Sequence, residues 1–178
     1  GTKYFNMNHS SNTNAGGWKG CDLRYDVLGS TNTNDGDATA TTATNPVANT
    51  LMAALPSDLR AVMQPMTIYT DNTGGGSDNA SYVTKTTDYL PLLAEYEIFG
   101  TRSYANSAEK NYQAQYAYYS AGNSKVKYCH SATSSTAWWW ERSPYYGYSY
   151  YFCFVYTNGN AYSNDARNSS GVAPAFRV

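Results

Sequence analysis

The sequence predicts a single domain of the α+β class, with short helices and small antiparallel strand pairs joined by long irregular loops. Three observations support this. With 178 residues, the chain is long enough for one domain with a core but short for two. Apolar residues at helical spacing fall mainly between residues 16 and 63. From residue 66 onward, short β-branched and aromatic stretches alternate with turn residues, as strands do.

The first 45 residues contain few periodic positions. Residues 1–15 are polar and predict an irregular entry segment. Between Gly16 and Ser30, Leu and Trp recur near helical spacing, and Asp22 is a candidate N-cap. Residues 30–45 are rich in Thr, Asn, Asp and Gly without periodicity, which indicates a loop.

Residues 46–63 form the strongest helical pattern in the chain. Pro46 suits a first helical turn, and the following apolar residues make one stripe. Pro56 should break this helix, and Ser57 should cap a second short one. The alternating, β-branched residues 66–70 then predict a strand.

Weaker signals follow along the chain. Residues 73–81, TGGGSDNAS, predict a flexible surface loop rather than a phosphate-binding loop, because no Lys-Ser/Thr follows the glycines. Residues 82–100 begin as a strand and continue as an apolar run. Residues 111–120 predict a short helix, and residues 125–130 a short strand.

The C-terminal region, residues 138–178, looks like the part around which the chain is organised. Seven of the 19 Tyr fall between residues 145 and 162, mixed with Asn, Ser and Gly. Tyr offers large contact area at low entropy cost, and the small polar residues offer adaptable hydrogen bonds, so this composition favours recognition. Asn-Gly within residues 157–160 predicts a hairpin turn. Trp138–Trp140 should belong to the scaffold, with Arg142 pairing an acid or stacking on a ring.

Composition excludes several classes of partner and site. Charged residues make up 14% of the chain with a net charge of −1 and no basic stripe, so we expect no nucleic-acid partner. No apolar run approaches the ~20 residues of a membrane-spanning helix, so we expect no membrane insertion. Without CxxC spacing, the three Cys should be reduced or buried, with one disulfide as the alternative.

No catalytic, metal or cofactor site is predicted. Glu95 and Glu97 could do acid–base work, but no partner residue lies near them in sequence, and a solvated edge is the better interpretation. His130 lacks a Ser or Cys at recognisable spacing. The short Asp35–Asp37 stretch does not have the spacing of a calcium loop.

The stretches WWWERSP (138–144) and GVAPAFRV (171–178) resemble those of a C-terminal domain found in many bacterial and phage proteins. That domain has the C-type lectin-like fold and is related to formylglycine-generating enzymes. Upstream, Gly17-Trp18 with Arg24 and LPLLAEYEIFG (90–100) also fit, so the resemblance covers about residues 16–178. It implies two short helices packed on small antiparallel sheets, in a single domain spanning residues 1–178. The usual first strands are not evident before Gly16.

Residues 145–168 also resemble the diversified segment of variable proteins of diversity-generating retroelements. In these, random replacement of template adenines changes Asn codons into codons that never encode Lys, Glu, Gln, Trp or Met, and residues 145–168 contain none of the five. The resemblance implies a framework of Phe152, Val155, Thr157, Gly159, Ala161, Ala166 and Ser169. It implies that the variable, ligand-binding residues are Tyr145, Tyr146, Tyr148, Tyr150, Tyr151, Phe154, Tyr156, Asn158, Asn160, Tyr162, Asn164, Asp165, Arg167 and Asn168.

These observations predict a binding module, not an enzyme. The resemblance implies an unidentified protein or glycan receptor on a cell surface, and a location on a phage virion or on the bacterial surface. The alternative is a carbohydrate-binding module of fixed sequence whose exposed aromatics stack on sugars. An oxidase related to formylglycine-generating enzymes is the weakest of the three, because Cys153 lies inside the apparently variable strand and 24 positions from Cys129.

Overall fold

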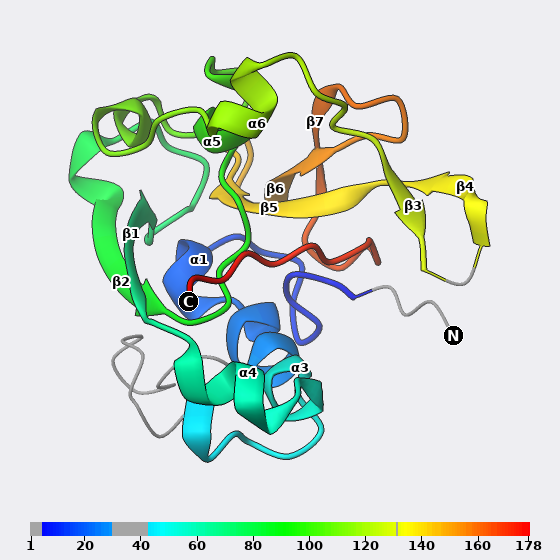
Figure 1. Cartoon of the computed structure of the whole chain (residues 1–178). Helices are drawn as coiled ribbons and strands as arrows, with labels where there is room; N and C mark the ends of the chain where they lie inside the picture. The colour runs from blue at the N-terminus through cyan, green and yellow to red at the C-terminus, as the bar shows by residue number, and fades with distance from the viewer. Residues whose placement is uncertain (1–4, 30–42, 131) are drawn as a thin grey trace.

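The computed structural model describes residues 5–29, 43–130 and 132–178 (Figure 1). Short helices and small antiparallel sheets make up this part of the chain, which confirms the predicted α+β class. The predicted loop at residues 30–45 and the start of the entry segment lie largely outside the described residues. Within the described part, no helix is long and apolar enough to cross a bilayer.

Every strand pair is antiparallel, and the largest sheet lies near the C-terminus. The strands are β1 (Met66–Asp71), β2 (Val83–Asp88), β3 (Lys127–Cys129), β4 (Ala132–Ala137), β5 (Trp139–Pro144), β6 (Tyr151–Val155) and β7 (Ala161–Asp165). β1 pairs with β2 and β3 with β4, while β5, β6 and β7 form a sheet in that order. The strands predicted near residues 66, 82 and 125 are therefore present.

The helices are all short. They are α1 (Gly17–Gly20), the π-helix η1 (Leu23–Leu28), α3 (Leu51–Ala54), α4 (Ser57–Val62), the 3₁₀-helices η2 (Ala80–Tyr82) and η3 (Ser107–Asn111), α5 (Glu95–Phe99) and α6 (Ala117–Ser120). Pro56 separates α3 from α4 as predicted. The helix predicted to start at Pro46 is α3, and it begins later, at Leu51. Thr50 Oγ1 caps it by accepting a hydrogen bond from Ala53 N. Asp22 makes no side-chain cap and instead accepts the N–H groups of His9 and Ser10.

The main core lies between the C-terminal sheet and the first helices. Trp18, Leu23 and Leu28 pack with Trp140, Phe152 and Phe154 in one buried cluster. Two buried ion pairs tie distant segments together: Arg24 Nε lies 2.8 Å from Asp88 Oδ1, and Arg142 is paired with Glu97. Removing one partner of such a pair would leave a buried charge alone, so both fix the fold firmly.

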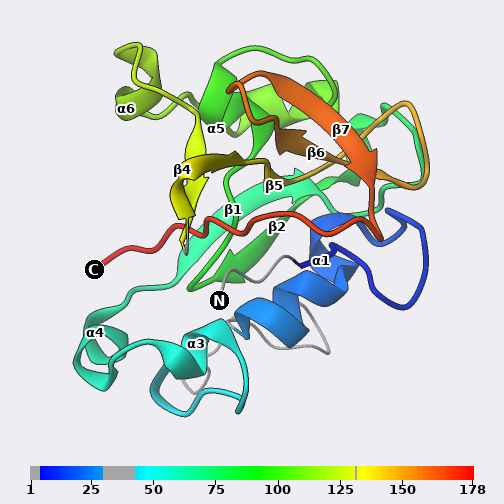
Figure 2. The ribbon, with the colours of Figure 1, turned by 90° about the vertical axis from the view of Figure 1, so that its right-hand side faces the viewer.

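The described part of the entry segment runs alongside the C-terminal region (Figure 2). Phe5 forms an isolated antiparallel bridge with Ser170, and Asn8 N donates to Ala166 O at 3.0 Å. Met7 is fully buried in the main core. The segment is irregular, as predicted, but it is packed against the region that carries the candidate binding residues.

Candidate binding surface

The fourteen predicted binding residues extend from the end of β5 to the turn after β7, and their exposure differs. Eight are exposed: Tyr148, Tyr150, Tyr156, Asn158, Asn160, Tyr162, Arg167 and Asn168. Five are half-buried: Tyr145, Tyr146, Tyr151, Asn164 and Asp165. Phe154 is buried. We call the thirteen exposed and half-buried residues the tyrosine face.

Phe154 corrects the predicted set. It is only 1% exposed and packs edge-on against Trp138 and Trp140, with ring centroids 5.1 and 5.9 Å apart. The reason is that side chains pack over both faces of β6: Phe152 and Phe154 lie in the main core, and Cys153 lies in a second cluster with Tyr96 and Ala105. Both faces of this strand are therefore covered, and Phe154 belongs with the framework.

The tyrosine rings of the face form one connected network. Tyr148 contacts Tyr150 and Tyr151, with centroids 5.7 and 5.4 Å apart, and Tyr151 stacks on Tyr145 at 6.3 Å. Tyr104, a residue outside the predicted segment, connects these rings to the tyrosines near the β6–β7 hairpin turn. Its ring lies 5.3 Å from Tyr145 and 6.0 Å from Tyr162. Burial raises the pKa of both Tyr104 and Tyr145 further above neutral pH, and their hydroxyl groups can donate hydrogen bonds.

At the other end of the face, the β6–β7 turn encloses a small hollow. Tyr156 N donates to Asn160 O at 2.8 Å, and Gly159 adopts φ 87°, which confirms the turn predicted from Asn-Gly. The hollow has a volume of about 480 Å³ and is lined by Tyr156, Asn158, Asn160, Ala161 and Tyr162. Two aromatic rings and two amides thus surround a concave site at the tip of the hairpin.

Asn14 supports the loop that precedes β6. Its buried Nδ2 lies 3.2, 2.9 and 2.8 Å from the main-chain oxygens of Tyr145, Tyr148 and Tyr151. Its Oδ1 accepts the N–H of Gly75 at 2.8 Å. A single side chain therefore holds three points of the tyrosine loop and joins it to the glycine-rich segment.

The glycine-rich segment, expected to be a flexible loop, is held against this support. Gly74 and Gly76 have φ of 65° and 72°. A Cβ on Gly74 would lie 1.9 Å from Asn14 O, and one on Gly76 would lie 2.8 Å from Ser149 N. The glycines therefore permit close contact between main chains, a role that no sequence signal indicated.

Glu95 and Glu97 correct another prediction, because both are buried rather than on a solvated edge. Glu97 receives two hydrogen bonds from Arg142, at 2.6 and 2.7 Å. Glu95 accepts the N–H groups of the loop at residues 103–105, at 2.8 to 3.0 Å. This positions Tyr104 in the ring network and Arg102 over the ring of Tyr146 at 3.9 Å. Glu95 thus supports the tyrosine face, whereas Glu97 pairs with Arg142 in the interior.

The three cysteines are not arranged as a reactive thiol site. Cys21, Cys129 and Cys153 are all buried, as expected. Burial raises the pKa of Cys21 to about 12 and that of Cys153 well above its ordinary value. Since the thiolate is the nucleophile, the thiols of Cys21 and Cys153 are unreactive at neutral pH.

Within the described residues, one group of side chains has the spacing of metal ligands: His9, Asp22 and Asp26. Asp22 Oδ2 already accepts hydrogen bonds from His9 N, Ser10 N and Ser10 Oγ, at 2.9 to 3.2 Å. The group is therefore accounted for by hydrogen bonding, and we assign no metal to it.

Comparison with known proteins gives a family but no function. No curated protein and no solved structure matches the chain. Residues 2–178 match the family described as "Domain of unknown function (DUF6273)". The chain therefore belongs to this family.

Proposed function

We propose that this chain is a recognition domain with a C-type lectin-like fold, and that the tyrosine face binds a receptor. The observation that carries the proposal is the connected ring network, which extends from Tyr148 to Tyr162 with several rings exposed. Clustered exposed aromatics are typical of contact sites, whereas single ones are ordinary on protein surfaces. The receptor would be a protein or glycan on a cell surface, met from a phage virion or from a bacterial surface.

Preorganisation supports binding by this face. Most rings rest against other rings, and Asn14 holds the loop beneath them, so little conformational freedom remains to be lost when a ligand binds. Tyr has few rotatable bonds, and its hydroxyl can donate or accept at the rim of a contact. The exposed Asn side chains near the hairpin tip add hydrogen bonds that adapt to the ligand.

We further propose that the face is diversified, as in variable proteins of diversity-generating retroelements. The hydrogen bonds from the Asn14 side chain to the loop go to main-chain oxygens, so these bonds do not depend on which side chains the loop carries. Replacement of the exposed side chains would then change the ligand without unfolding the domain. Phe154 is excluded from the replaceable set by its burial.

Sequencing the gene from many natural isolates tests diversification. The expected result is variation confined to the tyrosine face, at codons that match adenines in a nearby repeat. Phe152 and Phe154 serve as internal controls, since both are buried on the strand within the variable segment and should stay constant. A segment at 145–168 that is identical in all isolates, or variation spread over the whole chain, would contradict the proposal.

Binding itself is tested with a display library. The exposed positions of the face would be randomised to pyrimidine-ended codons and selected against intact bacterial cells. Enriched clones should fold like the parent and lose binding when Tyr or other aromatics at positions 148, 150 and 156 are changed to Ala. Enrichment of clones altered outside the face, with the face unaffected, would contradict the assignment of the site.

A fixed carbohydrate-binding module is the second candidate, and the hollow at the hairpin tip favours it. Two tyrosine rings 6.1 Å apart and neighbouring amides surround the hollow. Rings can stack on a sugar while amides bond its hydroxyl groups. Two results together would support this candidate over the first. The chain should bind sugars on a glycan array and lose that binding on Asn158→Ala or Tyr162→Ala, and residues 145–168 should be identical across isolates.

A further inference from the structure

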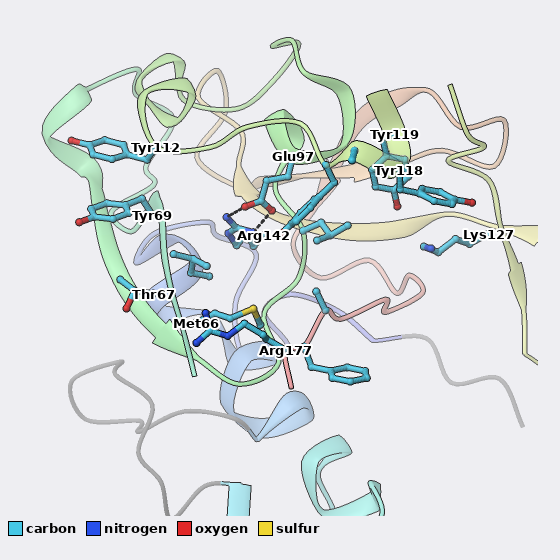
Figure 3. A pocket seen from close by; sticks show the side chains of 16 residues that line it. Met66, Thr67, Tyr69, Glu97, Tyr112, Tyr118, Tyr119, Lys127, Arg142 and Arg177 are labelled. Carbon is cyan, nitrogen blue, oxygen red and sulfur yellow. Dashed lines mark hydrogen bonds and ion pairs between the residues drawn. The ribbon is translucent and has the colours of Figure 1, made fainter. Parts of the chain in front are cut away.

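A wide groove of the described structure lies away from the tyrosine face. It has a volume of about 880 Å³, and no residue between 145 and 168 lines it. Its walls come from β1, the segment around α6 and the C-terminal residues 175–177 (Figure 3). The function proposed above makes no use of this groove.

One wall of the groove is the free edge of β1. Four consecutive residues of this strand, Met66 to Tyr69, line the groove, and none of β2 does. Side chains alternate between the two faces of a strand, so only an edge presents successive residues to one space. β1 has a strand neighbour on one side only, which is β2. The groove therefore runs along an unpaired strand edge.

Hydrogen bonds show which main-chain groups face the groove. Tyr69 O accepts from Gln113 Nε2 at 2.8 Å, and Asp71 N donates to Glu109 Oε1 at 3.0 Å, both on the side away from β2. Alternate residues of an antiparallel strand share this direction, so Thr67 presents its N–H and C=O there too. Thr67 makes no backbone hydrogen bond outside the β1–β2 pair within the described chain.

The protein already closes both ends of this edge. Gln113 takes the Tyr69 carbonyl at one end, while Gln64 N donates to Arg177 O at 2.8 Å at the other. Between them lies space for a short strand of about four residues, at ~3.3 Å per residue. The edge is thus open along a limited length, which favours a peptide over a long sheet.

The charges of the groove select the kind of peptide. Arg142 and Glu97 form a buried ion pair at its floor and neutralise each other. Lys127 and Arg177 also line the groove, and neither forms an ion pair with a described residue. The groove therefore presents two cationic side chains without an acidic partner among the described residues (Figure 3). Lys127 lies beside α6, with its ammonium 4.9 Å from the centroid of the Trp139 ring, and Arg177 lies beside Met66.

Aromatic side chains complete the walls. Tyr69 and Tyr112 stack at 4.3 Å on one side, and Tyr118 lies on the other. Tyr112, Tyr118 and Phe176 are 55%, 59% and 49% exposed. Such exposed rings along a strand edge offer contacts for alternate side chains of an added strand.

We propose that this groove binds an extended acidic peptide segment that pairs with the edge of β1. Main-chain hydrogen bonds to Thr67 hold the segment, its acidic side chains meet Lys127 and Arg177, and its apolar side chains contact the tyrosines. The recognition mode is strand addition, in which the backbone supplies affinity and the flanking groups supply selectivity.

The test uses a fluorescent, end-blocked hexapeptide that alternates valine with aspartate. Binding is followed by anisotropy, and the contact is located by the amide signals of Thr67 and Tyr69 in NMR spectra of the isotope-labelled chain. We expect saturable binding with shifts at both residues, and no binding of the same peptide with lysine in place of aspartate. Absence of shifts at millimolar peptide would overturn the proposal.

Two controls separate strand addition from simple charge attraction. A peptide N-methylated at alternate residues keeps its charges but cannot form the ladder, and it should bind at least tenfold more weakly. Equal binding would show that the groove is only a basic surface and refute strand addition.

On the protein side, Lys127→Glu with Arg177→Glu should weaken binding at least tenfold. Lys85→Glu, on β2 and outside the groove, should leave it unchanged. Concentration-dependent dimerisation without peptide, with shifts at Thr67, would assign the edge to a second copy of the chain and overturn the peptide proposal.

Discussion

Two successive stretches, Trp138–Pro144 and Tyr145–Tyr162, are both rich in aromatic residues. The first is largely buried, whereas much of the second is exposed to solvent. In the first, every residue of β5 is buried. Main-chain bonds from Trp140 to Gly171 and from Arg142 to Leu93 cover the edge of β5 that faces away from β6. In the second, only β6 is enclosed, and the tyrosines occupy the loop, the hairpin tip and β7. Coverage of the strand, rather than aromatic content, decides which rings form a platform and which form a surface.

The largest predicted difference between this platform and the tyrosine face concerns a matched pair of arginines, Arg142 and Arg167. Arg142→Ala leaves the buried Glu97 without its partner and should lower the free energy of unfolding by about 3–5 kcal/mol. Arg167→Ala removes an exposed charge and should change it by less than ~0.5 kcal/mol. Urea unfolding measures both values. Similar losses for the two variants would refute the division into platform and surface.

The next effect concerns the joint between platform and surface. Asn14→Ala removes the donor shared by three loop carbonyls and should cost about 1–3 kcal/mol of stability. Hydrogen exchange at residues 145–151 should rise more than elsewhere. Asn160→Ala, at an exposed position of the hairpin, is the control and should alter neither the stability nor the exchange at residues 145–151. Unchanged exchange in the Asn14 variant would mean that ring contacts alone hold the loop.

The stability of the buried platform should also depend on pH, through Glu141 of β5. Glu141 is fully buried, neither of its carboxyl oxygens has a hydrogen-bond partner among the described residues, and burial raises its pKa well above 4.5. The folded chain therefore binds this proton more tightly than the unfolded chain. The resulting stabilisation is complete below about pH 4.5 and is lost as pH rises through the folded pKa.

Glu141→Gln should flatten this dependence, because glutamine has no carboxyl proton to lose as the pH rises. A smaller loss of stability with rising pH should remain in this variant between about pH 4.5 and 7. It comes from Glu109, because burial raises the pKa of that carboxyl to about 7. Unfolding curves at several pH values measure both slopes. Identical slopes in parent and variant would show that Glu141 does not titrate as inferred.

The smallest expected effect is on the surface itself. Tyr148→Ser and Tyr156→Ser should each change stability by no more than ~0.5 kcal/mol, because both side chains are largely exposed. Phe154→Ala, two residues from Tyr156 but buried, should cost about 3–5 kcal/mol. Thermal and urea unfolding would compare the variants. A loss at Tyr156 as large as that at Phe154 would place Tyr156 in the framework.

Local signals predicted much of the fold. Each of these signals acts within a few residues. Pro56 cannot continue the preceding helix, Asn-Gly favours a hairpin turn, and the alternation at residues 66–70 lies within a single strand. The triple tryptophan could be assigned to the scaffold because residues in direct succession cannot share one strand face. Trp139 and Trp140 indeed pack into different clusters.

Features that depend on distant segments were not predictable. The resemblance placed Phe154 among the variable residues, yet packing over both faces of β6 buries it. Glu95 looked solvated because its partners, the N–H groups of residues 103–105, are set by a loop conformation. Tyr104 and Asn14 join the candidate site from positions far from it in sequence.

The contacts of Asn14 also bear on the order of folding. Its acceptors lie 131 to 137 positions along the chain, so these bonds form only after nearly the whole chain has come together. Closing so long a loop is entropically costly, and contacts of this kind are among the slow ones. The tyrosine loop should therefore take its final shape late in folding. A partner that recognises that shape would bind completed molecules and ignore partly folded ones.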